Sequence, residues 1–553
     1  MRRVGLWLGL AAATLALGCS EGGGEADRAS WSPQDVPESA RYGGTLVVGG
    51  TTPIESMNGL VSTGSVALQH EIHVLFATLV RLDPDFLARP YLARSWEVSD
   101  DGTQVVFHLR DDLSWHDGTP VTARDVQFTF DRAKDPRVEF PNRSYFDLWE
   151  ATEVLDDHTI RFYLRPHNGF LYGWARTPIM PRHILASVAP EDLRSHPFGV
   201  VRPVGSGPYR FVEHVAGDRW VFEANPDFPD ELGGRPYVDR LVYREIPDPT
   251  TLLAELRTGG VDVAVDVPPA LVRRIRSDST LTVVSYPVAD YTFIAWNTRR
   301  PVLSDPLVRR AITMAIDREA ILASVREGFG TVAAGPVGPW HWAYDTAWTP
   351  LPFDPDSARK LLDGAGWTRS PTGVRERDGV PLRLEILTNP SEERRDIAVI
   401  VQASLRAIGI DVRTRVVDPA TLGATLTSPD RRFDGAVIGW ARDVLLDDRD
   451  LWACDQLGQP FQFTSYCNPV LDPVLDSIPL TTDRARLEGL IRRYERIVAE
   501  DQPYTFLYYN TQVNAYRSRV HGLAFDARGD WTAASRWWLD PRGRRGTRSE
   551  IVD

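Results

Sequence analysis

The sequence predicts a mixed α/β protein that folds into more than one lobe. Three observations support this prediction: the length, the hydrophobic content and the alternation of strand-like with helical segments. The chain has 553 residues, of which 43% are hydrophobic and 10% are aromatic, which is enough to fill large cores. This composition excludes a disordered chain, and the length exceeds what a single domain usually needs.

Short segments of alternating or continuous apolar residues predict the strands. They cover residues 43–50, 103–110, 158–165, 381–388, 432–440 and 503–517. Helical spacing of apolar residues predicts helices over 65–80, 392–408 and 484–500. Thr122 to Asp125 is typical of the capping box that begins a helix. Alternation over this length favours α/β lobes over a solenoid or a helical bundle.

The N-terminus has the features of a secretory signal, with two arginines, an apolar run from Val4 to Leu17 and a small residue before Cys19. The run is shorter than the roughly 20 residues of a membrane-spanning helix. Residues 15–19 resemble the bacterial lipobox, whose cysteine is acylated. We therefore expect a signal peptide over 1–18, a lipid on Cys19 and a flexible tether over 19–40. An ordinary signal peptide with a chance cysteine is the alternative.

A lipid on Cys19 implies a protein anchored to the cell-envelope membrane and working outside the cytoplasm. The formal net charge is −13 at pH 7, and loss of Arg2 and Arg3 with the signal makes it −15. Because an acidic chain is a poor partner for nucleic acid, we expect none.

Two cysteines remain after Cys19, namely Cys454 and Cys467, thirteen positions apart. Such a pair usually oxidises outside the cytoplasm. A zinc site needs two more ligands, whereas no His or Cys lies between them. We expect a disulfide.

Patterns of enzyme and metal sites are weak in this sequence. His70 and His73 stand at i, i+3, which does not match the zinc-protease helix, so decoration of an amphipathic helix is the simpler interpretation. Residues 204–211 are Gly-rich but lack the lysine of a phosphate-binding loop, which favours a turn before a strand. No Gly-x-Ser-x-Gly elbow and no distinct pair of glycosidase carboxylates are found. We expect no enzyme activity, no cofactor and no metal.

The segment from Gly439 to Asp450 reads GWARDVLLDDRD and contains four carboxylates. It does not fit a calcium-binding loop, because it has no central glycine and no glutamate at the twelfth position. A carboxylate at a strand end could instead pair with a cationic ligand, and the neighbouring Trp440 could add cation–π attraction.

Seven segments, in order along the chain, resemble the extracytoplasmic solute-binding proteins of the peptide/nickel class, family 5. These are the receptors of oligopeptide and dipeptide ABC importers. The segments include LARSWEVSDDGTQVVFHLRDDLSWHDGTPVTARDVQFTF (92–130), PVGSGPYRF (203–211), LRTGGVDVAVDVPP (256–269) and FDGAVIGWARD (433–443). The others lie at 291–321, 353–367 and 405–412. Each segment is weak alone, but together they cover nearly the whole mature chain.

The resemblance implies a two-lobed periplasmic-binding-protein fold of class II (cluster C), with two hinge-crossing strands and an extra subdomain in the first lobe. Lobe I would cover 41–284, with the subdomain at about 85–200, lobe II would cover 285–512, and 513–553 would return to lobe I. The implied function is that of a monomeric, lipid-anchored receptor that closes on peptides and delivers them to the permease and ATPase of an importer. A receptor of the same fold for an opine, an oligosaccharide or a nickel chelate is the alternative.

The resemblance also implies the ligand-binding residues. The Gly-Trp-x-x-Asp motif of the family matches Gly439, Trp440 and Asp443, and the motif aspartate pairs with the α-ammonium of the ligand in peptide-binding members. Trp296 and Asn297 end a strand that resembles the ligand-facing strand of the family, although core packing explains Trp296 equally well.

Two departures from the family pattern concern the remaining residues. Dipeptide-selective members carry an arginine after the strand at 381–388, whereas this chain has Asn389 there and Arg394 only later. Asn389 is therefore a further ligand candidate, and strict dipeptide selection is not expected. The other carboxylates of the motif segment, at 447, 448 and 450, are expected to face solvent or cap a helix. The spacing of the two cysteines resembles a disulfide of dipeptide-binding relatives.

Overall fold

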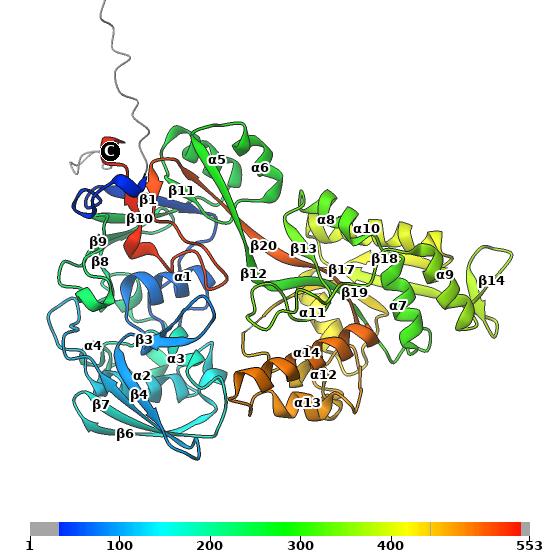
Figure 1. The fold of residues 1–553 in the computed structure, drawn as a ribbon, viewed down its shortest axis with the longest axis horizontal. Helices are drawn as coiled ribbons and strands as arrows, with labels where there is room; N and C mark the ends of the chain where they lie inside the picture. The colour runs from blue at the N-terminus through cyan, green and yellow to red at the C-terminus, as the bar shows by residue number, and fades with distance from the viewer. Residues whose placement is uncertain (1–32, 443, 544–553) are drawn as a thin grey trace, which may run out of the picture.

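The computed structural model describes residues 33–442 and 444–543, so Cys19 and Asp443 lie outside the described residues. Within them, one mixed sheet of eleven strands joins two lobes (Figure 1). Its order is β18 (Asp411–Val416), β17 (Arg383–Thr388), β19 (Gly435–Ala441), β12 (Leu281–Trp296), β20 (Tyr504–Arg517), β11 (Val263–Ala264), β1 (Thr45–Gly50), β10 (Arg240–Glu245), β9 (Arg219–Ala224) and β8 (Tyr209–Val215), with β13 (Gly330–Val332) paired to β20.

The strands β12 and β20 pass from one lobe into the other (Figure 1). They pair antiparallel from Leu281 with Arg517 to Ala295 with Tyr504. The register shifts between Pro287 and Tyr291, where β12 advances four positions while β20 advances two. The predicted lobe boundaries, 285 and 512, both fall inside these strands.

Lobe II is the part of the chain inserted between β12 and β20. Its helices are α7 (Pro306–Met314), α8 (Arg318–Val325), α9 (Pro355–Gly364), α10 (Glu392–Ala407), α11 (Pro419–Thr427), α12 (Arg449–Trp452), α13 (Asp472–Ser477) and α14 (Arg484–Asp501). A small hairpin sheet contains β14 (Thr368–Arg369), β15 (Arg375–Arg377) and β16 (Val380–Pro381). Alternate residues of β12 pack into two separate cores. Tyr291 and Phe293 lie in the core that contains residues of α14, whereas Ile294 and Trp296 lie in the core that contains residues of α10. Helices therefore cover both faces of this half of the sheet.

Lobe I contains the other end of the sheet and both ends of the described chain. Its helices are α1 (Ser65–His70), α5 (Pro249–Thr258) and α6 (Pro269–Arg276), and its short strand pairs are β2 (Val80–Leu82) with β3 (Ala88–Pro90) and β21 (Val520–His521) with β22 (Trp538–Leu539). The C-terminal Trp531, Trp537 and Leu539 lie in the same core as Leu46 and Val48 of β1. Residues near the C-terminal end of the described chain thus complete the core that β1 begins.

The extra subdomain of lobe I is a separate four-stranded sheet packed against helices. Its order is β4 (Ala93–Val98), β5 (Gln104–Leu109), β7 (Thr159–Leu164) and β6 (Trp149–Asp156), and its helices are α2 (Ala123–Lys134), α3 (Tyr172–Arg176) and α4 (Arg182–Leu185). The predicted capping box of α2 is present, because the Thr122 N–H donates to Asp125 Oδ2 over 2.9 Å. The six strands predicted from the sequence have observed boundaries that differ from the predicted ones by at most three residues.

The helix predicted over 65–80 is shorter in the structure. The α-helix ends at His70 and continues as one π-helical turn from Glu71 to Leu75. The turn stops there because the Leu75 carbonyl accepts the N–H groups of Ser206 and Gly207, over 3.0 and 2.8 Å. A Cβ on Gly207 would lie 2.6 Å from the Leu75 carbonyl carbon, so the Gly-rich turn before β8 needs its glycines for this contact.

His70 does not decorate the surface, as the sequence suggested, but is fully buried against Trp531. Burial lowers its pKa to about 3, although the Val66 carbonyl accepts a hydrogen bond from Nδ1. The adjacent Glu71 is also fully buried, and burial raises its pKa to about 8 despite a 2.7 Å hydrogen bond from Ser62 Oγ. Two neighbouring residues are thus both kept neutral by desolvation.

Candidate functional site: a cleft between two lobes

A cleft beside the two crossing strands contains three cavities that share lining residues. We call them the hinge cavity, of about 490 Å³, the central cavity, of about 300 Å³, and the mouth chamber, of about 340 Å³. The hinge and central cavities share Asp266, Val288 and Gln512. The central cavity and the mouth chamber share Phe86, Tyr172 and Val444. The cleft therefore runs from the hinge strands through the centre to the mouth.

Three of the predicted ligand-binding residues, Asn389, Gly439 and Trp440, line the hinge cavity together. Asn389 directly follows β17, and the other two belong to β19, so neighbouring strands carry them to one edge of the sheet. Gly439 keeps this edge open, because a Cβ there would lie 3.6 Å from Arg394 Nη2 and 3.2 Å from the Tyr291 carbonyl oxygen.

Trp440 is half-buried, and its indole is held from the lobe II side. Its Nε1–H donates to the Tyr504 hydroxyl over 3.2 Å, and its ring stacks on Phe463 with centroids 5.8 Å apart. The ring is thus fixed in position before a ligand arrives.

The edge of β19 is open where it borders the hinge cavity. On one side β19 pairs with β12 along its whole length, from Gly435 to Ala441. On the other side, in the described residues, it pairs with β17 only at Gly435 and Ala436. Backbone groups beyond Ala436 can therefore pair with an additional extended chain, as peptide-binding sheet edges do.

Trp296 and Asn297 lie inside lobe II and do not line the cleft. Trp296 is 0% exposed, and its Nε1–H donates to Thr505 Oγ1 over 2.9 Å. Asn297 Nδ2 donates to the carbonyls of Arg431 and Phe433, over 2.8 and 3.0 Å. The ligand-binding role predicted for these two residues is corrected to packing and loop support, because they lie at the end of β12 farthest from the hinge.

The predicted ligand partner Asp443 lies outside the described residues, but its neighbours Arg442 and Val444 both line the central cavity. Asp448 stands at the N-cap position of α12, but its side chain makes no capping hydrogen bond. The expectation that it faces solvent is corrected, because Asp448 is buried, while Asp447 is exposed. Asp448 accepts hydrogen bonds from Arg442 Nη2 and from the Tyr494 hydroxyl, and the side chains of the Arg442–Asp448 pair are only 9% and 2% exposed. A buried ion pair therefore holds both ends of the segment that contains Asp443.

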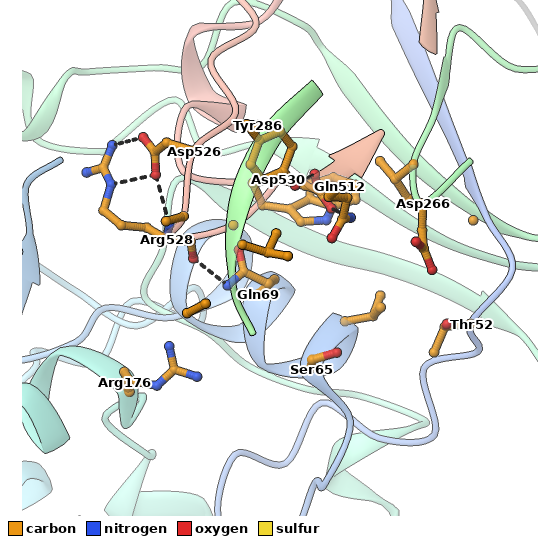
Figure 2. Close-up of a pocket in the computed structure, with 18 of the residues that line it drawn as sticks. Thr52, Ser65, Gln69, Arg176, Asp266, Tyr286, Gln512, Asp526, Arg528 and Asp530 are labelled. Atoms are coloured by element: carbon orange, nitrogen blue, oxygen red, sulfur yellow. Dashed lines mark hydrogen bonds and ion pairs between the residues drawn. The ribbon is translucent and has the colours of Figure 1, made fainter. Parts of the chain in front are cut away.

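Carboxylates without a cationic hydrogen-bond partner line one wall of the central cavity. Asp530 accepts from Tyr286, from Gln512 Nε2 over 3.0 Å and from Asn514 Nδ2 over 2.5 Å, all of them neutral donors. Figure 2 shows Asp530, Gln512 and Tyr286 gathered at this wall, with Asp266 beyond them. Desolvation raises the pKa of both Asp530 and Asp266. This wall lowers the electrostatic cost of holding a cation and raises that of holding an anion.

Cationic side chains lie on other walls of the cleft. In the central cavity, the Arg528 guanidinium forms an ion pair with Asp526 over 2.6 Å, and the Arg528 carbonyl accepts a hydrogen bond from Gln69 Nε2 over 2.9 Å (Figure 2). In the hinge cavity, Arg326 pairs with Glu393 over 3.4 Å. Arg394, in the first turn of α10, also lines this cavity, and its guanidinium has no ion pair or hydrogen bond with the part of the chain that the structure describes.

Sequence reasoning missed these charged residues for different reasons. Asp266 stands two positions after the short apolar strand β11, and a carboxylate just beyond a strand end was the signal that could have found it. Asp530 lies in a C-terminal segment without any recognised motif, so nothing in the sequence places it near β12. Arg394 lies in the first turn of α10, which begins at Glu392 and borders the cavity, so a position a few residues after the strand is still close enough to line it.

The two lobes touch at the mouth of the cleft. The Asn168 N–H, in the subdomain, donates to the Pro479 carbonyl over 2.8 Å. Its side-chain Nδ2 donates to the carbonyls of Ile478 and Thr481, over 2.7 and 3.1 Å. These acceptors lie between α13 and α14, which Figure 1 shows on the subdomain side of lobe II, away from the hinge strands. The structure therefore has lobes joined at both ends of the cleft.

The cysteine pair lies close to the candidate motif. Cys454 and Cys467 form a disulfide, and the Cys454 N–H donates to Asp472 Oδ1 over 3.0 Å. The enclosed loop contains Phe463, which stacks on Trp440. The disulfide thus closes the loop that supports the indole of the motif.

A match to a family model shows which family the chain belongs to. The model for bacterial extracellular solute-binding proteins, family 5 Middle, matches residues 88–459. The chain belongs to this family. The oligopeptide-binding protein AppA of Bacillus subtilis is 31% identical over 508 residues, which are 90% of this chain and 92% of AppA. The dipeptide-binding protein of Escherichia coli is 25% identical over 467 residues, 80% of this chain and 84% of that protein.

Solved structures agree with the fold of this family 5 protein. AppA from Bacillus subtilis in complex with a nonapeptide matches with a TM-score of 0.71 and 30% identity, over 90% of this chain and 99% of AppA. NikZ from Campylobacter jejuni in complex with Ni(L-His) matches with a TM-score of 0.71 and 26% identity, over 89% and 99% of the two chains. The predicted family and the predicted two-lobed fold are confirmed.

The family assignment also bears on the class and place of action of the chain. Its relatives are solute-binding proteins of ABC importers and not enzymes, and the family acts outside the cytoplasm. Between residues 33 and 543, leaving out 443, no helix combines the length and hydropathy needed to cross a membrane.

Proposed function

We propose that this family 5 protein captures peptides between its lobes by adding them as an extended strand to the open edge of β19. The observation that supports the proposal most directly is the end of β17–β19 pairing at Ala436, three residues before Gly439, where β19 begins to line the hinge cavity. A peptide supplies alternating N–H and C=O groups that match such an edge without regard to side chains. The complex of AppA with a nonapeptide, at 30% identity, supports a peptide ligand.

The charged ends of the peptide have candidate partners near this edge. We assign the α-ammonium to Asp443, as the motif resemblance implies, and the α-carboxylate to Arg394. A desolvated ammonium or carboxylate needs an opposite charge, and a charge-assisted hydrogen bond contributes about twice as much as a neutral one. Arg394 Nη2 lies close to Gly439, and the guanidinium has no competing partner among residues 33–442 and 444–543.

The remainder of the proposal concerns delivery. A lipid on Cys19 anchors the mature chain to the cell-envelope membrane, the tether over 19–40 lets it move, and a permease with its ATPase receives the ligand from the closed, monomeric receptor. The lipobox and the family relatives support this part. Mass spectrometry of the N-terminal fragment tests the anchor, because a fragment beginning at acylated Cys19 is expected and an unmodified cysteine contradicts it.

Isothermal titration calorimetry with peptides of two to nine residues tests capture. Asp443→Asn is expected to weaken binding of peptides with a free N-terminus more than about tenfold, because it removes a charge-assisted bond. N-acetylated peptides should bind the wild type and this variant equally. Asp447→Asn, an exposed neighbour, is the matched control.

The other end of the peptide is tested in the same way. Arg394→Gln should weaken peptides with a free C-terminus but not C-terminal amides, and the exposed neighbour Arg395→Gln should change neither. Equal affinities for all variants contradict the two assignments. Failure of every peptide to bind, with an opine, an oligosaccharide or a nickel chelate found as co-purified ligand, contradicts peptide capture itself.

A further inference from the structure

The mouth chamber lies at the end of the cleft where the lobes touch, and both lobes supply its walls. Leu82, Phe86 and Leu171 line it from lobe I, and Trp342, Leu445 and Leu487 line it from lobe II. Leu445 packs so closely on lobe I that a Cβ on Gly169 would lie 2.2 Å from its Cδ2. The chamber therefore exists in this shape only while the lobes are together.

Two of the polar side chains of the chamber, His341 and Arg484, are already engaged by protein groups. His341 Nε2 donates to the Val444 carbonyl over 3.0 Å, and its Nδ1 accepts the Ala343 N–H over 3.0 Å. Burial lowers the pKa of His341 to about 4, so the ring is neutral at physiological pH. The Arg484 guanidinium lies 4.2 Å from the centroid of Trp342. An occupant thus meets mainly apolar surface, and the other polar side chains of the lining include Asp85 and Thr482.

The chamber opens into the central cavity through Phe86, Tyr172 and Val444, which line both spaces. Phe86 has a φ of +57°, which is unusual for a bulky side chain and is retained mainly where the surroundings impose it. Leu446, next to the chamber residue Leu445, has a φ of +49°. Each lobe therefore presents a strained turn to the junction, consistent with a binding role.

We propose that the mouth chamber is a specificity subsite that takes one large apolar side chain, aromatic or aliphatic, of the captured peptide. The proposal rests on the proposed peptide function and adds the chemistry of the preferred ligand. The backbone lies along the hinge and central cavities, and a single side chain reaches the chamber through the junction at Phe86. Because residues of both lobes contact that side chain, its burial favours the closed form over the open one.

Pentaalanine and five peptides that each carry one phenylalanine in place of an alanine are the probes. Burial of a phenylalanine side chain should raise affinity about tenfold or more at the one position that reaches the chamber. Titration calorimetry of the full mature chain with these six peptides measures the preference, and the other four positions should differ from pentaalanine by only a few-fold.

Leu487→Asn places an amide in the chamber and should abolish the preference for that one phenylalanine, while pentaalanine binds as to wild type. Leu307→Asn is the matched control, because Leu307 is an exposed leucine of α7 outside all three cavities, and it should keep the preference. Ala88→Phe fills the chamber without adding polarity and should also abolish the preference, which covers the case that Leu487→Asn does not fold.

The outcomes separate the subsite from the function on which it rests. Pentaalanine binding with no preferred phenylalanine position overturns the subsite and leaves peptide capture standing. A preference that survives both chamber variants also overturns the subsite. If none of the six peptides binds and longer peptides also fail, peptide capture is overturned and the subsite with it.

Discussion

Replacing Asp448 by asparagine should destabilise lobe II severely, although the substitution only exchanges one carboxylate oxygen for an NH2 group. Asp448 accepts hydrogen bonds from Arg442 and Tyr494, and the Tyr494 hydroxyl itself accepts the Trp452 Nε1–H over 2.9 Å. The side chains of the ion pair are 9% and 2% exposed, so water cannot replace the lost charge. Removing one member of a buried pair typically costs about 3–5 kcal/mol, because the other charge stays buried alone.

Urea unfolding followed by tryptophan fluorescence measures this cost as a change in the free energy of unfolding. Asp447→Asn is the control, since that side chain is exposed and surface substitutions usually stay within about 0.5 kcal/mol. The double variant Arg442→Met, Asp448→Leu should recover much of the loss, because an apolar pair leaves no charge unpaired. If the free energy of unfolding of Asp448→Asn lies within about 1 kcal/mol of the wild-type value, the pair does not hold the segment around Asp443.

Three further predictions concern other parts of the molecule. Glu71→Gln should remove one contribution to the pH dependence of stability: the folded-state pKa of Glu71, about 8, exceeds the ordinary 4.5, so the contribution of this residue is greatest below pH 4.5 and falls as the pH rises to about 8. The loss of stability is at most about 5 kcal/mol, at 1.36 kcal/mol per pKa unit. Urea unfolding at pH 5 and pH 8 measures it, and the control Glu376→Gln, at an exposed position, should keep the wild-type pH dependence. Asn168→Ala removes two hydrogen bonds between the lobes and should speed ligand release about tenfold in stopped-flow fluorescence; an unchanged rate contradicts a role in closure. Replacing Cys454 and Cys467 by serine should lower stability by about 3 kcal/mol, and an unchanged urea midpoint contradicts it.

The sequence predicted regular elements well where local pattern and tertiary structure agree. The strands at 381–388 and 503–517 and the helix at 392–408 were found close to their observed bounds, because each has a clear apolar period and a distinct end. The helix at 65–80 was overextended, because its end depends on a Gly-rich turn far along the chain that binds the Leu75 carbonyl. Apolar spacing alone contains no information about such a partner.

The candidate site was predictable only in part, for a related reason. Gly439, Trp440 and Asn389 follow or end strands that the sequence shows, and the structure brings them to one cavity. Trp296 ends a strand of the same kind, but alternate positions of β12 face different cores, and the sequence did not show that its end lies away from the hinge. Asp448 resembled its solvent-facing neighbours, because its burial depends on Arg442 and Tyr494, the latter 46 positions later.

The C-terminal return of the chain has a consequence for biogenesis. Lobe II is one continuous stretch, whereas the core of lobe I lacks Trp531, Trp537 and Leu539 until the end of the chain arrives. During export from the N-terminus, lobe II can collapse on its own contacts while lobe I still exposes β1 and β10 around an unfilled interior. Contacts between the two ends of a chain close slowly, since the longest loop must be ordered first. The lobe made first is thus the lobe finished last.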